Sequence, residues 1–357
     1  MSKALNEVLG AIAPDPREEQ ARRAAHAQWA SIAKPLDSLG LLEKAVEDMA
    51  ALTLDHKIHI SSRALLLLCA DNGVVDQGVT QTDYTVTAAV ARNAGANRSS
   101  VCKMAQVAHC KVVAVDMGMR DPGQIPGVLD RRIGNGTRDI TQGPAMARGE
   151  AEQAVLTGVE LVRELKDRGA DLIATGEMGI GNTTTSSAVA CVLLGRPVAE
   201  MTGRGAGLSD QGLERKLWAI ETALERNRPD PLDPLDVLSK VGGFDIAGMC
   251  GIYLGGALYR VPILMDGFIS TVAALCAARL CPEAGKAMFA SHVSAEPAGR
   301  LVLDALGKQP LIAAGMRLGE GTGAVCAIPM LDMALSLYQD GATFDSTGIE
   351  AYTPQGG

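Results

Sequence analysis

The stretch DLIATGEMG (171–179) is a short apolar run that ends in a loop of small and polar residues. Three further runs have the same form, namely ALLLLCADNG (64–73), KVVAVDMGM (111–119) and VPILMDGF (261–268). Each run is followed by a loop and then by a longer amphipathic segment. Continuous apolar strands that alternate with helices are typical of a parallel sheet covered on both faces. The sequence therefore predicts an α/β fold, with a parallel sheet flanked by helices in a Rossmann-like three-layer arrangement.

Both ends of the chain have a helical pattern instead. In residues 1–60, apolar side chains recur at a spacing of three to four between scattered prolines. The segment AIPMLDMALSLYQ (327–339) is a second helix of mostly apolar character near the other end. We therefore predict a small helical domain made of residues 1–60 and 325–357, and a large α/β domain over residues 61–324.

The overall composition excludes several classes of function. The chain has 357 residues, of which 47% are apolar, and a formal net charge of -8. Nucleic-acid surfaces normally need a clustered basic excess, so we expect no nucleic-acid partner. The most apolar region, 246–280, is interrupted by Arg260 and Asp266, which leaves pieces too short to span a bilayer. Residues 1–23 lack the apolar core of a signal peptide. The eight scattered cysteines are consistent with free thiols in a reducing cytosol. Both observations predict a cytoplasmic protein.

The loops that follow the four apolar runs are the expected ligand-binding positions, because ligands of parallel α/β sheets bind outside the carboxyl ends of the strands. The most conspicuous loop is GEMGIGNTTTSSAV (176–189). Read as a dinucleotide fingerprint it is incomplete, since Thr184 stands where a third glycine is needed. Read as a site for one phosphate it offers backbone N–H groups and the hydroxyls of 183–187 at the start of a helix. An ordinary helix cap at Asn182 or Thr183 explains the same residues.

Further glycine loops favour a cleft lined by backbone. They are GRGAGLSDQGLERK (203–216), VGGFDIAGMCG (241–251), MDGFIS (265–270) and LGEGTGA (318–324). One such loop is common in any protein, whereas five in an otherwise apolar chain indicate a phosphorylated ligand.

The residue types exclude several chemistries. The chain has no G-x-S-x-G elbow, and only His292 of its five histidines lies near a predicted strand end, where a structural or substrate-positioning role is favoured over that of a base. His56 and His59 have no further ligands around them, so we predict no metal site and no cofactor. Glu320, between two glycines before an apolar helix, is a candidate general base because desolvation raises the pKa of a carboxyl group. A helix-start glutamate favoured by the dipole is the alternative, and Glu177 offers a second carboxylate.

The combined motifs resemble one enzyme family. In order and spacing, over residues 35–340, the chain resembles the nicotinate-nucleotide:dimethylbenzimidazole phosphoribosyltransferases of cobalamin lower-ligand synthesis. The motifs that carry this resemblance are ADNGVVDQGVTQTDYTVT, DMGM, GEMGIGNTTTSSA, GRGAGLSD, GGFDIAGMCG, PILMDGFIS, SHVSAEPAG and LGEGTGA.

The resemblance implies a pentosyltransferase that moves 5-phosphoribosyl from nicotinate mononucleotide to an aromatic base, giving an α-riboside phosphate and nicotinate. It also implies a homodimer, with pairing to a paralogue left open. The implied catalytic residues are Glu320 as general base and Glu177 near the ribose and nicotinate. The implied phosphate and ribose contacts are Gly179, Gly181, Asn182, Thr183, Lys216 and Asp266. The implied walls around the base are Thr80, Gln81, Met178 and Leu318.

The chain departs from the family pattern in the loop around the base. Members that use dimethylbenzimidazole often have serine and an aromatic-proline pair after the Gly-Val, whereas this chain has Thr80, Gln81, Thr82 and Asp83. The more polar rim leaves the acceptor open between dimethylbenzimidazole, another benzimidazole, adenine and a phenol. An NAD-dependent oxidoreductase and a catalytically inactive nucleotide-binding subunit are the alternative functions.

Overall fold

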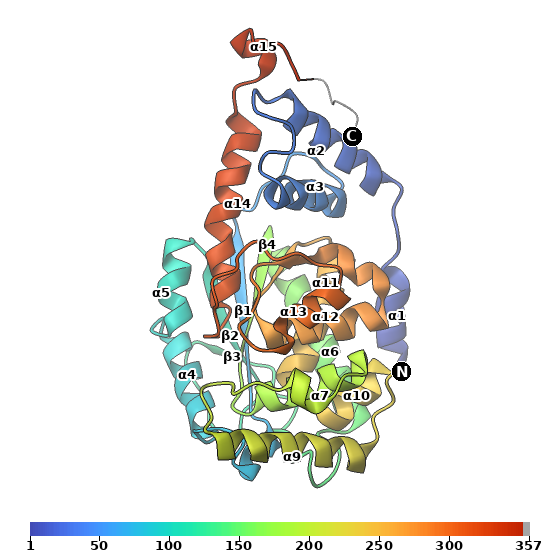
Figure 1. Ribbon diagram of the computed structural model, residues 1–357, viewed down its shortest axis with the longest axis vertical. Helices are drawn as coiled ribbons and strands as arrows, with labels where there is room; N and C mark the ends of the chain where they lie inside the picture. Colours follow the sequence, from blue (N-terminus) through green and yellow to red (C-terminus); the bar gives the residue numbers. More distant parts are fainter. Residues whose placement is uncertain (353–357) are drawn as a thin grey trace.

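A computed structural model describes residues 1–352 and contains one six-stranded parallel sheet (Figure 1). The strand order is β3-β2-β1-β4-β5-β6. In chain order the strands are β1 (Arg63–Ala70), β2 (Lys111–Gly118), β3 (Val128–Asp130), β4 (Leu172–Met178), β5 (Ile263–Met265) and β6 (Met288–Ala290). All four predicted apolar runs form strands, which confirms the α/β class. The two short edge strands, β3 and β6, were not predicted.

Helices cover both faces of the sheet. In chain order the α-helices are α1 (Lys3–Ala11), α2 (Arg17–Ser31), α3 (Leu41–Thr53), α4 (Thr85–Gly95), α5 (Ser100–Val107), α6 (Arg148–Asp167), α7 (Asn182–Leu194), α8 (Val198–Met201), α9 (Asp210–Asn227), α10 (Pro234–Val241), α11 (Phe244–Tyr259), α12 (Phe268–Leu280), α13 (Ala298–Ala305), α14 (Thr322–Asp340) and α15 (Phe344–Thr347), with 3-10 helices η1 (Gly73–Gln77) and η2 (Pro282–Ala287). Helices α11 and α12 lie on one face of the central strands, and α6 packs on α11. Helices α4, α5 and α14 cover the other face.

The contact between α6 and α11 is built from glycines. A Cβ atom on Gly158 would lie 1.9 Å from the carbonyl oxygen of Gly248, and one on Gly251 would lie 1.8 Å from that of Val155. The two helix backbones therefore touch directly, which leaves no room for a side chain at either position. Helix α11 is buried along most of its length, and its four glycines allow neighbouring segments to approach this closely.

Helices from the N-terminal and C-terminal parts of the chain meet at one end of the molecule (Figure 1). Helices α2 and α3 pack together there, and the last turns of α14 join them through the Trp29 and Tyr338 rings, whose centroids are 4.9 Å apart. We call α2, α3 and the C-terminal half of α14 the helical bundle. Helix α1 instead packs on α6 and α11. The division of the chain into two domains stays a prediction, and residues 353–357 of the predicted helical domain lie outside the described residues.

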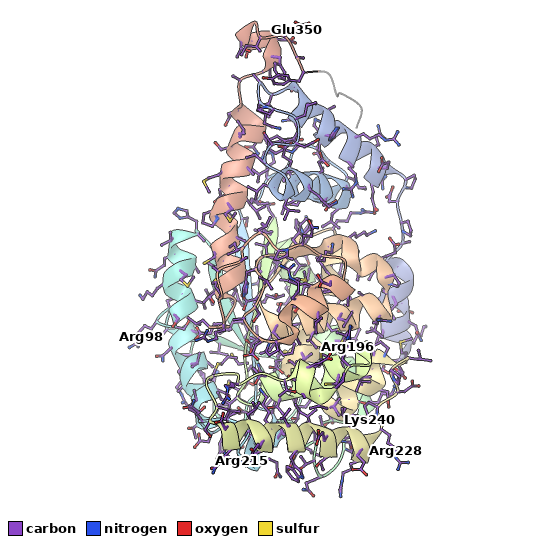
Figure 2. The ribbon with its side chains drawn as sticks, in the orientation of Figure 1. Arg98, Arg196, Arg215, Arg228, Lys240 and Glu350 are labelled. Carbon is purple, nitrogen blue, oxygen red and sulfur yellow. The ribbon has the colours of Figure 1, made fainter. Side chains whose placement is uncertain are left out.

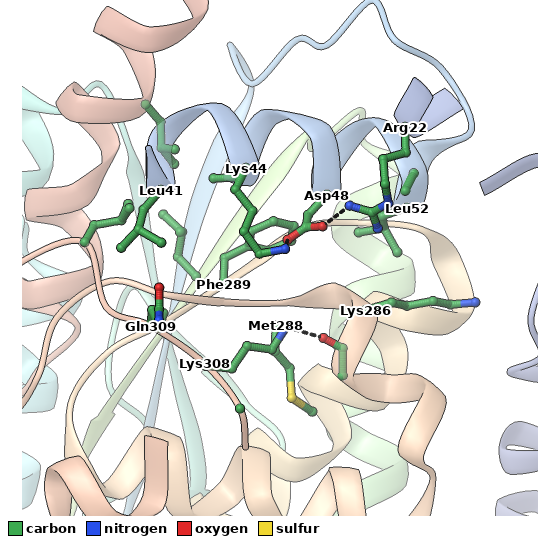
Figure 3. A pocket seen from close by; sticks show the side chains of 18 of the residues that line it. Arg22, Leu41, Lys44, Asp48, Leu52, Lys286, Met288, Phe289, Lys308 and Gln309 are labelled. Carbon is green, nitrogen blue, oxygen red and sulfur yellow. Dashed lines mark hydrogen bonds and ion pairs between the residues drawn. The ribbon is translucent and has the colours of Figure 1, made fainter. Parts of the chain in front are cut away.

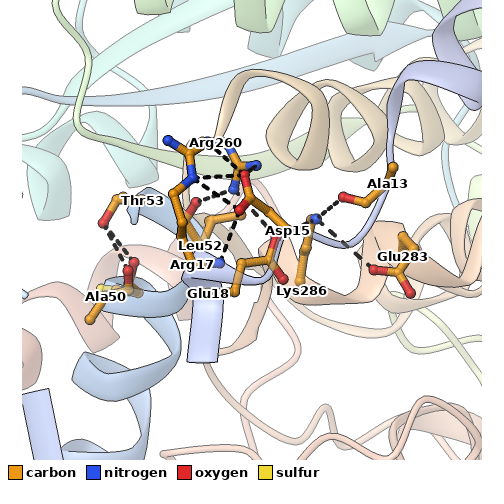
Figure 4. A network of polar contacts seen from close by, with 11 residues as sticks. Ala13, Asp15, Arg17, Glu18, Ala50, Leu52, Thr53, Arg260, Glu283 and Lys286 are labelled. Atoms are coloured by element: carbon orange, nitrogen blue, oxygen red, sulfur yellow. Dashed lines mark hydrogen bonds and ion pairs between the residues drawn. The ribbon is translucent and has the colours of Figure 1, made fainter. Parts of the chain in front are cut away.

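A polar network joins the helical bundle to the rest of the chain (Figure 4). The Arg260 guanidinium, just after α11, contacts Asp15 at 3.1 Å and Glu18 at 3.3 Å. Lys286 in η2 contacts the same Glu18 at 2.7 Å. These ion pairs are partly exposed, so each contributes modestly, but together they fix the start of α2 against α11 and η2.

The cysteines agree with the expectation from composition, whereas the absence of a nucleic-acid partner stays a prediction. Figure 2 shows the labelled cations Arg215 and Arg228 at the lower end of the molecule and Arg98 at its side. All eight cysteines are free thiols, and seven of them are buried. Within residues 1–352, no helix combines the length and the apolar character that crossing a bilayer requires.

The glycine contact between α6 and α11 predicts a stability effect. Gly251→Ala should lower the free energy of unfolding by about 1–3 kcal/mol or more, because the added methyl overlaps the backbone of α6. Gly149→Ala in α6 is the matched control, since a Cβ atom there meets nothing within 4 Å. Thermal and denaturant melting curves of both variants measure the effect. Equal stability of the two variants would contradict the direct backbone contact.

Candidate active site

A cavity of about 280 Å³ lies where the sequence predicts ligand binding, outside the carboxyl ends of β4 and β5. Its walls come from the loop after β4, the start of α7, the loop after β5 and the segments 205–206, 292–296 and 317–320. Eight predicted site residues line this cavity: Glu177, Met178, Gly179, Asn182, Thr183, Asp266, Leu318 and Glu320. These eight residues come from three separate motifs of the sequence, which the sheet brings together.

Glycines shape the loop between β4 and α7. A Cβ atom on Gly179 would lie 2.5 Å from the carbonyl oxygen of Ala70 at the end of β1. Gly181 has φ 94°, a left-handed conformation that suits glycine, and it directly precedes the first residue of α7. The loop can therefore turn tightly into α7, where the N–H groups of Asn182 and Thr184 donate to the carbonyl oxygens of Gly179 and Gly181. A helix start of this kind attracts anions.

Lys216 supplies the positive charge beside this helix start. Its side chain is fully buried on α9, and its Nζ donates hydrogen bonds to Thr183 Oγ1 at 2.9 Å and to the Gly203 carbonyl oxygen at 3.1 Å. Burial lowers the pKa of Lys216 to about 8, against the opposing effect of Glu296. An ammonium group and a helix N-terminus meet at Thr183, which is the arrangement that a phosphate group requires.

Glu177 is a buried carboxyl group next to a second acid. The Asn182 side-chain amide donates to Glu177 Oε2 and also to Asp245 Oδ2, the latter at 2.9 Å. Burial, reinforced by the charge of Asp245, raises the pKa of Glu177 to about 8. Burial likewise raises the pKa of Asp245 to about 6. Glu177 is therefore protonated near neutral pH, so it enters the cavity as a neutral acid.

Glu320 lies in a backbone turn of three left-handed residues. Its φ is 60°, between Gly319 at 82° and Gly321 at 87°. Such a conformation costs energy for any residue other than glycine, and at a ligand cavity it is a feature that active sites retain. The Glu320 Oε2 atom accepts a hydrogen bond from Val101 N at 3.4 Å, and burial raises the pKa of this carboxyl group. A desolvated carboxyl group of raised pKa is suited to accept a proton.

Asp266 holds the turn that contains Glu320. Its carboxylate is buried and accepts hydrogen bonds from the backbone N–H groups of Gly321, Gly323 and Ala324, at 3.1, 2.8 and 3.2 Å. His292 Nδ1 lies 3.9 Å from the same carboxylate. Both oxygens of Asp266 are thus directed at the start of α14. Its contact with the ribose or phosphate stays a prediction.

Four of the predicted site residues do not line the cavity, namely Thr80, Gln81, Gly181 and Lys216. Lys216 contacts the cavity wall through its hydrogen bond to Thr183. Gly181 shapes the turn behind it. Gln81 Nε2 donates to the carbonyl oxygens of Ala206, at 3.2 Å, and Gly207, and so contacts a loop that does line the cavity. Thr80 Oγ1 donates to the carbonyl oxygen of Thr82. The roles of these residues stay predictions.

Sequence reasoning missed two buried polar residues behind the cavity, Asp245 and Asn72. Asp245 lies inside VGGFDIAGMCG, one of the predicted glycine loops, so its place in the sequence could have identified it as a candidate site residue. Asn72 Oδ1 accepts a hydrogen bond from Thr185 Oγ1 at 3.1 Å. The Asp245 Oδ1 and Asn72 Nδ2 atoms are buried without a hydrogen-bond partner within the described chain. Nothing in the local sequence shows that residues so far apart meet.

Residues 1–352 contain no group of three or more histidine, cysteine or acidic side chains placed to hold a metal ion. The acidic side chains around the cavity instead accept hydrogen bonds from the Asn182 amide and from backbone N–H groups.

Comparison with known proteins gives consistent matches. A model of a family described as phosphoribosyltransferase matches residues 15–349. A protein of Ruminiclostridium cellulolyticum named nicotinate-nucleotide–dimethylbenzimidazole phosphoribosyltransferase is 45% identical over 324 residues, which are 91% of this chain and 92% of that protein. A protein of the same name from Acetivibrio thermocellus is 46% identical over 325 residues, 91% of this chain and 93% of that protein. The crystal structure of CobT from Thermus thermophilus has a TM-score of 0.88 and 38% identity, covering 93% of this chain and 99% of that one.

The raised pKa of Glu177 predicts a pH-dependent stability difference. Below about pH 4.5 this group is protonated in both the folded and the unfolded chain, so it has no effect. As the pH rises toward 8, only the unfolded chain releases the proton, which destabilises the fold. Glu177→Gln removes this penalty and should be more stable than the wild type by about 1–4 kcal/mol at pH 8, with the difference vanishing toward pH 4.5.

Denaturant unfolding at a series of pH values measures this difference. Glu214→Gln, an exposed substitution on α9, is the control and should leave the pH profile unchanged. A constant difference between Glu177→Gln and the wild type from pH 5 to pH 8 would exclude a protonated Glu177.

Proposed function

The chain belongs to the phosphoribosyltransferase family whose model matches residues 15–349, and we propose that it transfers the 5-phosphoribosyl group of nicotinate mononucleotide to an aromatic base. The products are the α-riboside 5′-phosphate and nicotinate, and 5,6-dimethylbenzimidazole is the acceptor that the names of its relatives indicate. The observation that carries this proposal is the meeting of Lys216 and the α7 start with two desolvated glutamates in one cavity. The comparisons favour neither an oxidoreductase nor an inactive subunit.

The donor phosphate is proposed to bind between Thr183 and Lys216. A phosphate there accepts a hydrogen bond from the N–H group of Thr183 at the positive end of α7, and the Lys216 ammonium lies within one hydrogen bond of Thr183. The phosphate brings negative charge close to a fully buried cation, so its binding offsets the cost of burying Lys216. The phosphate thereby fixes where the ribose ring lies relative to the two glutamates.

The reaction itself needs little from the protein beyond alignment and one proton transfer. An acceptor nitrogen attacks the anomeric carbon, the bond to the pyridinium nitrogen breaks, and its electron pair neutralises the pyridinium ring. The departing nicotinate is a good leaving group, and attack from the opposite face converts the β-nucleotide into an α-riboside. Holding both rings in line therefore supplies much of the acceleration.

Glu320 is the proposed general base. When the acceptor nitrogen forms its new bond, the ring becomes cationic and must lose the proton on its other nitrogen. The N–H group of Val101 donates to Oε2 of Glu320 and holds the carboxyl group at the cavity wall, where it is proposed to take this proton. Glu177, protonated near neutral pH, lies against the same turn, since a Cβ atom on Gly319 would be 2.9 Å from Glu177 Oε1. It is proposed to border the ribose and nicotinate without adding a charge there.

The acceptor ring is proposed to lie between apolar side chains at the mouth of the cavity. Met178, Ile180 and Leu318 line the cavity, and Leu318 is 55% exposed. Thr80 and Gln81 are proposed to border the ring through the loop at Ala206. An exposed leucine at the mouth of a substrate cavity is a surface that a second copy can cover, which supports the proposed homodimer. The protein is further proposed to act in the cytoplasm.

Replacing the proposed base gives the first test of the function. Glu320→Gln should lower kcat by about 100- to 10,000-fold, because the amide cannot accept the acceptor proton. The KM for nicotinate mononucleotide should change little. Chromatography of released nicotinate with dimethylbenzimidazole as acceptor measures the rate, and Glu214→Gln is the control. Turnover unchanged by Glu320→Gln would remove Glu320 from the base role.

The phosphate site is tested by a donor that lacks the phosphate. Lys216→Met should lower kcat/KM for nicotinate mononucleotide on the order of 10- to 100-fold, because one charged hydrogen bond to the phosphate is lost. With nicotinate riboside as donor, the variant and the wild type should have similar kcat/KM values. Equal losses with both donors would show that Lys216 acts on folding or chemistry and not on the phosphate.

A further inference from the structure

A second and larger cavity lies between the helical bundle and the edge of the sheet (Figure 3). Its volume is about 520 Å³, and its walls come from α2 and α3 on one side and from β6, η2 and residues 307–311 on the other. It shares no lining residue with the candidate active site. In Figure 1, α3 and α9 lie at opposite ends of the molecule, so this cavity is separate from the Lys216 site.

The polar part of this cavity has more cations than carboxylates. Lys44 Nζ lies 3.6 Å from Asp48 Oδ2, and Arg22 contacts the other oxygen of the same carboxylate. Opposite them, Lys308 Nζ donates to the Gly285 carbonyl oxygen at 2.8 Å (Figure 3). Arg22 also lies 3.8 Å from Glu19, a carboxylate outside the cavity lining that pairs with Arg23 at 2.8 Å. Among the residues that line the cavity, Arg22, Lys44 and Lys308 have one nearby carboxylate, Asp48, which leaves a surplus of two positive charges in the lining.

Lys308 is the cation that most needs an anion. It forms no ion pair within 4.0 Å with any carboxylate of residues 1–352, and the carbonyl oxygen of Gly285 is its hydrogen-bond acceptor. Burial lowers its pKa, and the nearby Lys44 and Arg22 lower it further, whereas Asp48 opposes them. A desolvated ammonium group without a counter-charge is costly, and a bound anion removes that cost.

Lys286 and Glu18, which also line the cavity, do not change this balance. Their charges pair with one another at 2.7 Å, and Glu18 also contacts Arg260. Lys286 points away from the centre of the cavity in Figure 3. The surplus charge therefore comes from the group of Arg22, Lys44 and Lys308 around Asp48.

The rest of the cavity is apolar. Leu41 and Leu52 of α3 face Leu264 of β5 and Phe289 of β6 across it. Such a surface binds a flat or compact hydrocarbon body, while the cations bind a charged group at its end. Sites for small molecules commonly combine an apolar lining with a few charged groups in this way.

We propose that this cavity binds a phosphomonoester that carries a compact apolar body. A dianionic phosphate matches the surplus of two positive charges, and lysine and arginine side chains donate the hydrogen bonds that phosphate oxygens accept. A monoanionic carboxylate leaves one of the cations without a counter-charge. The proposal concerns a site apart from the catalytic cavity and does not depend on the proposed reaction.

Calorimetric titration of the full chain with phenyl phosphate tests the proposal. The Lys216→Met variant serves as the background, so that the proposed catalytic phosphate site is weakened. We expect one saturable site per chain, with weaker binding of inorganic phosphate, which lacks the ring, and of benzoate, which lacks the second charge. Adding Lys308→Met should weaken phenyl phosphate binding about 10-fold or more, because a charged hydrogen bond is lost.

Lys44→Met provides a second test that does not depend on a half-buried residue. Its side chain is 66% exposed, so the substitution should leave the melting temperature unchanged while it weakens binding in the same direction. Lys57→Met, at an exposed position outside the cavity, is the control and should bind as the background does. The proposal is overturned if the background shows no saturable site, if Lys44→Met and Lys308→Met bind phenyl phosphate unchanged, or if benzoate binds more tightly than phenyl phosphate.

Discussion

The hydrogen bonds between the Asp266 carboxylate and three backbone N–H groups are the constraint on which the active site depends. Asp266 directly follows β5, and the N–H groups of Gly321, Gly323 and Ala324 open α14. One side chain therefore ties the end of a strand to the start of the C-terminal helix. Glu320 stands one residue before these N–H groups, in a left-handed conformation that costs about 1–3 kcal/mol. The three hydrogen bonds and the helix dipole act against that strain, although burial still raises the pKa of Asp266.

The cavity combines one buried cation with several buried acids. Lys216 contacts Thr183 near the start of α7, and in the proposed function it is the partner of the phosphate. Glu177 and Asp245 share the amide of Asn182, the first residue of α7, whereas Glu320 lies in the turn before α14. Burial raises the pKa of each of these acids. With a pKa of about 8, Glu177 adds no charge at neutral pH, whereas Glu320 is ionised when it acts as the proposed base.

The sequence predicted the parts of the fold that depend on local pattern. Continuous apolar runs identified β1, β2, β4 and β5, and the glycine loop after β4 lies beside the cavity as expected. The edge strands β3 and β6 have three residues each, too few for a pattern to show. Asp266 was predicted to contact the phosphate or ribose, but its hydrogen bonds run to residues more than 50 positions away. Contacts of that range depend on how the strands are ordered, which no local pattern contains.

The two cavities differ in which groups compensate their buried charges, and the difference follows from the position of each cavity in the fold. At the carboxyl ends of the strands, N–H groups and the Asn182 amide are available to satisfy the buried carboxyl groups. Between the helical bundle and the sheet edge, Lys308 finds the carbonyl oxygen of Gly285 and no carboxylate within ion-pair distance in residues 1–352. A backbone carbonyl accepts a hydrogen bond but cannot neutralise an ammonium group. Most carboxyl oxygens around the first cavity are therefore satisfied internally, with Asp245 Oδ1 as an exception, whereas the proposed anion from outside the chain completes the second cavity.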